Sequence, residues 1–334
     1  MHVLYGSEPS FYTRKAWIGL RLLGLEVDDR PKSLAVKAEV EAAVNGYHRF
    51  PVVQCPDGRW LIDSTDLLVT LSEEHDSRSL LPGDPALDAL NRVLDDWIDE
   101  WMIRPVILHR VAHPETRAWV AHRGGRALLG LRPQDPTPAD HEERLARMGP
   151  KLEGFFANVG QVHAVGEATW PAVEALLHDT CAAFDAALAA SPFLLGSRPS
   201  LADAALWGML DAGLLWEPAV RERIAPRYPH LAAFHARLAT AAGRGAEGGW
   251  DPAPVAAERL AALLDGDALG FAPFLNANSA ALTGEPPPTI DGHEVPPRPF
   301  TEKNRRRLGH LLGSLPPAAL PNWPLLSAYT ENPA

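Results

Sequence analysis

Residues 49–73 read RFPVVQCPDGRWLIDSTDLLVTLSE, and this stretch decides the fold of the first part of the chain. Two apolar runs, 49–54 and 59–62, are separated by Pro56-Asp57-Gly58, which is typical of a turn between paired strands. An acid–hydroxyl pair, Asp63-Ser64, follows, and residues 65–74 have the apolar spacing of a helix. The stretch therefore predicts a β-hairpin followed by a helix.

The residues before this hairpin predict the rest of one small domain. Residues 2–6 are typical of a strand, and residues 11–23 carry apolar side chains at helical spacing until Gly24. Residues 25–29 suggest a second strand, and residues 33–44 a second helix that ends at Asn45-Gly46. The order is β-α-β-α-β-β-α, which favours a small mixed sheet covered by helices.

The rest of the chain is predicted to be helical. A turn-rich break at 80–85 is followed by helical patterns at 86–111, 115–130, 138–158, 169–190, 201–216 and 229–243. A glycine-rich join at 243–249 precedes a helix at 254–265, a proline-rich stretch and a basic helix at 303–312. We therefore expect domains at 1–78 and 86–245, with a C-terminal extension at 251–334.

Composition and charge exclude several classes of function. The chain has 334 residues and a formal net charge of −11, which argues against a nucleic-acid-binding surface. Its cysteines, Cys55 and Cys181, are too few and too far apart for a disulfide framework, which favours a reducing, cytoplasmic location. No apolar run approaches the roughly 20 residues that cross a bilayer, so we expect no membrane association.

Three short motifs carry candidate chemistry. Ser10 lies at the start of the first helix, where free N–H groups and a hydroxyl would stabilise a thiolate. Pro51 opens the hairpin, where a cis bond would leave the backbone of Phe50 free to pair with an extended peptide. Asp63 and Ser64 precede a helix and suit the ammonium and carboxylate of an α-amino-acid group.

Each motif also has a purely structural interpretation. Ser10 and Asp63-Ser64 would serve equally as helix caps, and Pro51 as an ordinary trans proline at a strand start. A fourth motif, Ser200-Leu201-Ala202-Asp203, is interpreted as a capping box that starts a buried helix.

The order and spacing of these motifs resemble those of the glutathione transferase superfamily, of the serine or cysteine type. The matching stretches are LYGSEPSFYTRKAWIGLRLLGLEV, RFPVVQCPDGRWLIDSTDLLVTLSE and FLLGSRPSLADAALWGML. The resemblance implies an α/β thioredoxin-like N-terminal domain (β-α-β-α-β-β-α) followed by an all-α domain. It further implies glutathione as co-substrate, a small hydrophobic electrophile as partner, and a homodimer.

The resemblance also implies a role for individual residues. Ser10 would face the glutathione sulfur, with Tyr12 and Thr13 as alternatives. Phe50, before Pro51, would pair with the cysteinyl backbone, and Asp63 and Ser64 would hold the γ-glutamyl group. His48 or Arg49 would meet the glycyl carboxylate. The resemblance thus implies Ser10 as the catalytic residue and His48, Arg49, Phe50, Pro51, Asp63 and Ser64 as glutathione-binding residues.

The chain departs from the family pattern in ways that bear on function. Phe11 replaces the usual proline after the serine, and no cysteine lies in the first helical turn, which disfavours a disulfide-reducing mechanism. The activity expected is transfer of glutathione to an electrophile. The alternatives are a non-catalytic binding protein with the same fold, or a glutathione-dependent isomerase, lyase or dehalogenase. His109 and His113, four residues apart, have no identifiable third partner, so no metal site is expected.

Overall fold

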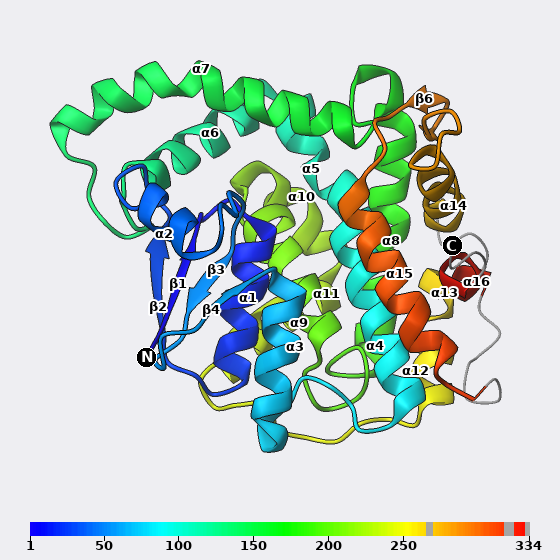
Figure 1. Ribbon diagram of the computed structural model, residues 1–334. Helices are drawn as coiled ribbons and strands as arrows, with labels where there is room; N and C mark the ends of the chain where they lie inside the picture. The colour runs from blue at the N-terminus through cyan, green and yellow to red at the C-terminus, as the bar shows by residue number, and fades with distance from the viewer. Residues whose placement is uncertain (265–269, 317–323, 331–334) are drawn as a thin grey trace.

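A four-stranded mixed sheet forms the first part of the chain, as Figure 1 shows. The computed structural model describes residues 1–264, 270–316 and 324–330. The strands lie in the order β2-β1-β3-β4, with β2 parallel to β1 and the others antiparallel to their neighbours. Their bounds are β1 His2–Gly6, β2 Val27–Pro31, β3 Val52–Gln54 and β4 Trp60–Ile62. The predicted element order is confirmed, although β2 begins two residues later than expected.

Helices cover this sheet and present their apolar sides to it. They are α1 Phe11–Leu22, α2 Lys37–Ala43 and α3 Ser64–Glu74. Helix α1 buries Ala16, Ile18 and Leu20, which matches the apolar spacing in the sequence. Helix α2 begins four residues later than predicted, because the chain first makes a turn in which Val36 and Lys37 donate to the carbonyl of Ser33.

The second part of the chain is helical and begins with a long rod. Helix α4 (Pro85–Trp97) runs through a π-helical segment, Ile98–Met102, into α5 (Ile103–Ala112). The following helices are α6 Pro114–Leu128, α7 Ala139–Val162, α8 Trp170–Ala190, α9 Leu201–Met209, α10 Pro218–Arg227 and α11 Pro229–Ala241. Helix α10 was not predicted, because prolines at both of its ends obscure its short pattern.

The two parts are joined by close packing of α1 against α9. A Cβ atom on Gly208 of α9 would lie 2.6 Å from the carbonyl oxygen of Phe11, so glycine permits this approach. The predicted capping box starts α9: Ser200 Oγ accepts from Asp203 N, and Ser200 N donates to Asp203 Oδ2. Burial raises the pKa of Asp203 to about 6, against the hydrogen bonds that favour its charged form.

The C-terminal extension folds back on the helical rod, and α15 lies beside α4 in Figure 1. Its elements are α12 Ala253–Arg259, α13 Ala261–Leu264, α14 Phe271–Ala281, the hairpin β5 Thr289–Ile290 and β6 His293–Glu294, α15 Pro299–Gly313 and α16 Pro324–Thr330. The predicted helix 254–265 is divided after Arg259, and residue 265 lies outside the described residues. The sequence had not indicated α14, the hairpin or α16.

Two further observations concern the helical part. The join at 243–249 is held in place, since Ala246 N donates to Leu22 O and Ser197 N donates to Gly249 O. Within the described residues, no helix combines the length and the apolar character that a bilayer crossing needs.

Candidate functional site

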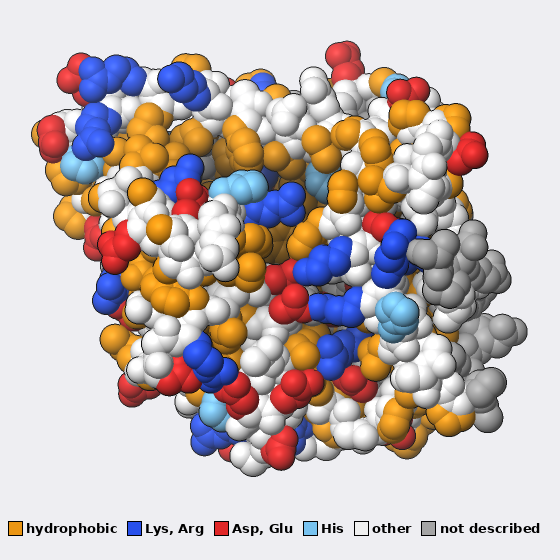
Figure 2. Space-filling view, viewed as in Figure 1, with side chains coloured by type: hydrophobic (Ala, Val, Ile, Leu, Met, Phe, Trp, Pro, Cys, Tyr) orange, Lys and Arg blue, Asp and Glu red, His pale blue; other side chains and the backbone are white. Residues whose placement is uncertain are grey.

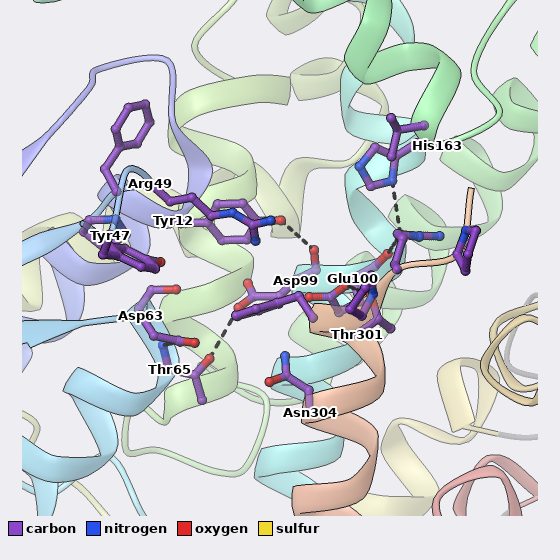
Figure 3. Close-up of a pocket in the computed structure, with 18 of the residues that line it drawn as sticks. Tyr12, Tyr47, Arg49, Asp63, Thr65, Asp99, Glu100, His163, Thr301 and Asn304 are labelled. Atoms are coloured by element: carbon purple, nitrogen blue, oxygen red, sulfur yellow. Dashed lines mark hydrogen bonds between the residues drawn. The ribbon is translucent and has the colours of Figure 1, made fainter. Parts of the chain in front are cut away.

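A cavity of about 350 Å³ lies where the sheet domain, the helical rod and the C-terminal extension meet. Its volume is in the range typical of small-molecule sites. Figure 2 shows charged side chains of both signs around a hollow in this face, and Figure 3 shows the side chains that line it. We call the lining residues among 47–51 and 63–65 the first wall, and those among 99–100, 162–163, 296–301 and Asn304 the second wall; His48 does not line the cavity.

The edge of strand β3 forms one part of the first wall. The Phe50–Pro51 peptide bond is cis, as the family resemblance implies, and both residues line the cavity. Within the described chain, the N–H and C=O of Phe50 make no backbone hydrogen bond, whereas Val52 pairs with Tyr5 and Ile62. The first wall therefore offers a free backbone edge to an extended ligand.

Buried Lys32 supports this edge from behind. Its ammonium group donates to the carbonyl oxygens of Tyr47 and Arg49, and it forms an ion pair with Glu41 at 3.2 Å. These contacts fix the backbone of the segment while the Arg49 side chain remains exposed at the cavity.

The start of helix α3 forms the other part of the first wall. Asp63 has a left-handed φ of 68°, and its Oδ1 accepts from Thr65 N at 3.1 Å and Asp66 N at 3.4 Å. Asp63 is thus a helix cap, which is the structural interpretation of the motif, but it also lines the cavity together with buried Ser64. The helix start gives this corner a positive partial charge that suits a carboxylate.

The start of helix α1 approaches the cavity through Tyr12. Ser10 is a helix cap, with its Oγ accepting from Thr13 N at 3.2 Å, and it is not among the residues that line the cavity. Thr13 Oγ1 accepts from Ser7 N and is buried. Tyr12 lines the cavity and donates from its hydroxyl to the carbonyl of Asp99 at 3.0 Å. Burial raises the pKa of Tyr12 well above its usual value, so the phenol stays protonated.

A buried ion cluster joins the second wall to α1 and α3. Lys15 lies between Asp95 and Asp99, with its Nζ 2.6 Å from a carboxylate oxygen of each. Lys15 also donates to Thr65 Oγ1 at 2.7 Å. Burial raises the pKa of Asp99, and the Lys15 charge opposes this rise. The cluster fixes α3, and with it Ser64, against the rod.

The rest of the second wall comes from side chains that are distant in sequence. Glu100, on the π-helical segment, accepts from the hydroxyl of Thr301. Arg298 donates from Nη1 to the carbonyl of Glu100 and to His163 Nδ1, each at 3.2 Å. Burial lowers the pKa of His163 well below its usual value, and the charges of Arg298 and Arg104 add to this effect. His163 is therefore neutral and accepts the hydrogen bond.

The sequence identified most of the first wall and none of the second. Of the predicted residues, Arg49, Phe50, Pro51, Asp63 and Ser64 line the cavity. Ser10 and His48 do not, and His48 is exposed at the surface. Residues 296–299 follow a proline-rich pattern with no recognisable motif, so no local signal could have singled out Arg298.

The remaining candidates are the histidine pair at the end of α5 and the two cysteines, and none of them lines the cavity. His109 is buried on α5, stacks on His113 and accepts from Arg223 at 2.9 Å. In the described ranges, no group of three or more His, Cys, Asp or Glu side chains is placed to hold a metal ion. Both cysteines are buried, and burial raises the pKa of the Cys181 thiol to about 12.

The fold and the cavity define a class of protein with a thioredoxin-like sheet domain, a helical domain and a small-molecule cleft at their junction. Residues 4–79 match the family model of the glutathione S-transferase N-terminal domain, and residues 167–237 match that of the C-terminal domain. These two segments therefore have the sequence of glutathione S-transferase superfamily domains. The first wall lies inside the first match, whereas the whole second wall lies outside both matches.

Solved structures with similar folds are distant in sequence. The β-etherase LigF from Sphingobium sp. strain SYK-6 is 19% identical over 71% of this chain and 94% of its own, with a TM-score of 0.49. A glutathione S-transferase from Rhodospirillum rubrum F11 is 21% identical over 71% and 87%, with a TM-score of 0.47. A theta class enzyme from Xanthomonas axonopodis pv. citri, solved with glutathione bound, is 20% identical over 74% and 98%, with a TM-score of 0.42. No curated protein matches the sequence.

Proposed function

We propose that this chain is a glutathione transferase that binds the tripeptide along the first wall and directs its thiolate at an electrophile held against the second wall. One observation carries the proposal: the free edge at Phe50, the helix start at Ser64 and the start of α1 at Tyr12 meet in one cavity. Each offers the chemistry that one part of the tripeptide requires. We also propose that the chain is divided into domains at 1–78 and 86–245, with a C-terminal extension at 251–334.

The tripeptide would lie in an extended form along the first wall. The backbone of Phe50 would pair with the cysteinyl backbone, as in the addition of a strand to a sheet edge. The γ-glutamyl carboxylate would lie at the start of α3 by Ser64, and Asp63 would face its ammonium group. Arg49 would meet the glycyl carboxylate from the rim of the cavity.

The reaction would be a displacement or addition at the electrophilic centre. Release of the thiol proton to solvent leaves a thiolate, which forms a carbon–sulfur bond as the leaving group departs with its electron pair. A hydroxyl at the start of α1 would donate to the thiolate and contribute about 1–2 kcal/mol to its stabilisation. Ser10 is the sequence-based candidate for this hydroxyl. Tyr12 is the better placed candidate, because its side chain lines the cavity, and its O–H would turn from the Asp99 carbonyl to the thiolate.

Two substitutions test this assignment. We expect Tyr12→Phe to lower kcat/KM with glutathione and chlorodinitrobenzene about tenfold, and to raise the pKa of the bound thiol. Ser10→Ala is expected to cost about 1 kcal/mol of unfolding free energy, as for the loss of a helix cap, with a smaller change in turnover. The measurements are steady-state kinetics, thiolate absorbance against pH, and denaturant unfolding. The opposite pattern would assign the sulfur-facing role to Ser10.

A non-catalytic glutathione-binding protein is the second candidate. It is favoured by two facts: Ser10 does not line the cavity, and the Tyr12 hydroxyl already donates to the carbonyl of Asp99. Calorimetric titration with glutathione separates the candidates when combined with a panel of aryl halides, epoxides and β-aryl ethers. Binding without turnover across the panel would support the second candidate, and the absence of both would reject the two together.

A further inference from the structure

Arg298 is a buried arginine with unused hydrogen-bonding capacity beside the cavity. Its residue is 9% exposed, and it lines the cavity at the start of α15. Nη1 donates to the Glu100 carbonyl and to His163, but Nε and Nη2 have no hydrogen-bond partner in the described part of the chain. A buried donor without a partner is costly, so a partner is expected from outside the chain.

Among the described residues, three of the four other buried arginines form ion pairs, and the fourth, Arg126, donates to a hydroxyl and two carbonyl oxygens. Arg110 reaches the carboxylate of Glu217 and two carbonyl oxygens, and Arg305 holds both oxygens of Glu302. Arg104 pairs with Asp291 and a carbonyl. Arg298 forms no such ion pair among the described residues, and it is the arginine there with two buried, unpartnered nitrogens.

The two unpartnered groups lie on one edge of the guanidinium. In arginine, the Nε–H and one N–H of Nη2 point in the same direction and form the side-on pair that holds a carboxylate through two parallel bonds. Nη1, on the other edge, is already used. This edge therefore has the donor geometry of a carboxylate receptor. Both nitrogens are covered by neighbouring protein atoms, so a carboxylate reaches them when the surrounding side chains shift.

The position of Arg298 is fixed independently of any ligand. Its backbone N–H donates to Asn278 Oδ1 at 2.6 Å, and its carbonyl accepts from Asn278 Nδ2 at 3.1 Å. Its guanidinium also lies over the ring of Phe274 at 4.0 Å. Burial lowers its pKa to about 10, which still leaves the guanidinium charged at neutral pH. A preorganised charged donor is what a specific anion site requires.

We propose that Arg298 receives a carboxylate of the second substrate, so that this chain selects anionic electrophiles. The inference rests on the proposed function. The carboxylates of glutathione have receptors on the first wall, at Ser64 and Arg49, whereas Arg298 is bonded to His163, which lies across the cavity from Asp63 in Figure 3. This replaces the small hydrophobic electrophile that the family resemblance implies.

Matched probes test the inference with and without chemistry. The full chain is titrated calorimetrically with dinitrobenzoate and with dinitrobenzamide, which differ in charge, in the presence and absence of unreactive S-methylglutathione. Turnover is then measured with glutathione and the corresponding chlorodinitrobenzoate and chlorodinitrobenzamide, each divided by its uncatalysed rate. The variants are Arg298→Gln, Arg298→Lys and, as a control on the same helix, Arg306→Gln.

We expect the wild-type chain to bind the benzoate at least about tenfold more tightly than the amide. Arg298→Gln should remove that preference, so that benzoate turnover falls at least about tenfold more than amide turnover. Arg298→Lys should keep part of the preference, because it retains the charge but not the two-bond edge. Arg306→Gln should behave as wild type, because Arg306 lies on the same helix but pairs with Glu302 outside the cavity.

The outcomes separate this inference from the proposed function. Suppose the wild-type chain binds and turns over the benzoate and the amide equally well, with glutathione turnover intact. That result would overturn the proposed anion site and leave the proposed transferase activity standing. Benzoate binding that depends on Arg298, with no glutathione binding, would support the anion site and overturn the transferase. If Arg298→Gln does not fold, the wild-type discrimination and Arg298→Lys still decide the question.

Discussion

The two walls of the cavity are built by different physical means. The first wall consists of a strand edge and a helix start, so its proposed ligand groups are backbone atoms, a helix cap and the Arg49 side chain, all within 19 residues of sequence, 47–65. The second wall consists of side chains from the rod, the end of α7 and the extension, which meet only in the folded chain. The first is specified by local sequence, and the second by burial of charge among distant segments.

This difference predicts where the molecule is most vulnerable. The first wall contains few buried charges, whereas the second wall and its supports contain Lys15, Asp95, Asp99, Glu100 and Arg298. Removing one member of such a buried set leaves the others uncompensated. The ion cluster around Lys15, which connects the two walls, is therefore the first target for substitution. Further substitutions then perturb each wall separately.

Lys15→Met should have the largest effect on stability. Lys15 compensates Asp95 and Asp99 at 2.6 Å each, and its removal leaves two carboxylates close together in the interior. We expect a loss of about 3–5 kcal/mol of unfolding free energy, measured by denaturant titration. Glutathione affinity should fall as well, because the same cluster holds Thr65 beside Ser64.

A compensating variant makes this test specific. Lys15→Met combined with Asp95→Asn and Asp99→Asn should recover part of the lost stability, because the uncompensated charges are gone. Arg59→Met, which breaks an exposed pair with Glu74, is the surface control and should leave stability almost unchanged. A Lys15→Met protein as stable as wild type would contradict the stabilising role of Lys15 in the buried ion cluster.

The same contrast explains what could be predicted from the sequence. Strands β1 to β4 and helices α1 to α3 follow from periodicity and turn residues, and Phe50, Pro51, Asp63 and Ser64 follow from motifs with fixed spacing. Ser10 belongs to the same pattern, but its oxygen is a cap and Tyr12, two residues on, lines the cavity. Which of these two side chains points into the cavity depends on its direction around the first helical turn. The spacing of the motif does not specify that direction.

The second wall could not be predicted because nothing local marks its residues. Arg298 lies in a proline-rich segment, His163 follows the end of a long helix, and Glu100 is one of several acids on the rod. Their roles depend on α15 packing against α4, which is a contact between residues about 200 positions apart, as the Arg298–Glu100 bond shows. The amino-acid composition of these segments does not indicate that α15 packs against α4.

Acid should weaken the helical part through His109. Burial, followed by the charge of Arg223, lowers the pKa of His109 to about 3 from an ordinary value of 6.5. The unfolded chain then binds a proton below pH 6.5 that the folded chain does not, so stability falls as the pH falls from about 6.5 toward 3. The slope contributed by this group approaches 1.4 kcal/mol per pH unit at its steepest, an order-of-magnitude value.

His109→Asn should flatten that dependence. The asparagine side chain places an oxygen near the position of Nδ1 and accepts from Arg223, but it does not titrate. Unfolding free energies between pH 4 and 7, compared with wild type, measure the effect. His48→Asn, at an exposed histidine of the first domain, is the matched control and should leave the profile unchanged. Identical profiles for wild type and His109→Asn would reject the assignment.

The smallest expected effect concerns the rim where the walls meet. Arg49 belongs to the first wall, and its guanidinium lies 5.4 Å from the ring centroid of Phe300 on the second wall. Its neighbour His48 points to solvent and does not line the cavity. If Arg49 meets the glycyl carboxylate, Arg49→Ala should weaken glutathione binding about five- to tenfold, or about 1 kcal/mol, whereas His48→Ala should not.

The amide of the glycyl group sharpens this prediction. Glutathione with a C-terminal amide lacks the charge that Arg49 would bind, so wild type and Arg49→Ala should bind it almost equally. A loss for both ligands would instead show that Arg49 acts by packing on Phe300 and holding the walls together. The double difference between two ligands and two proteins isolates the charge contact from that packing, because the packing contribution is common to both ligands.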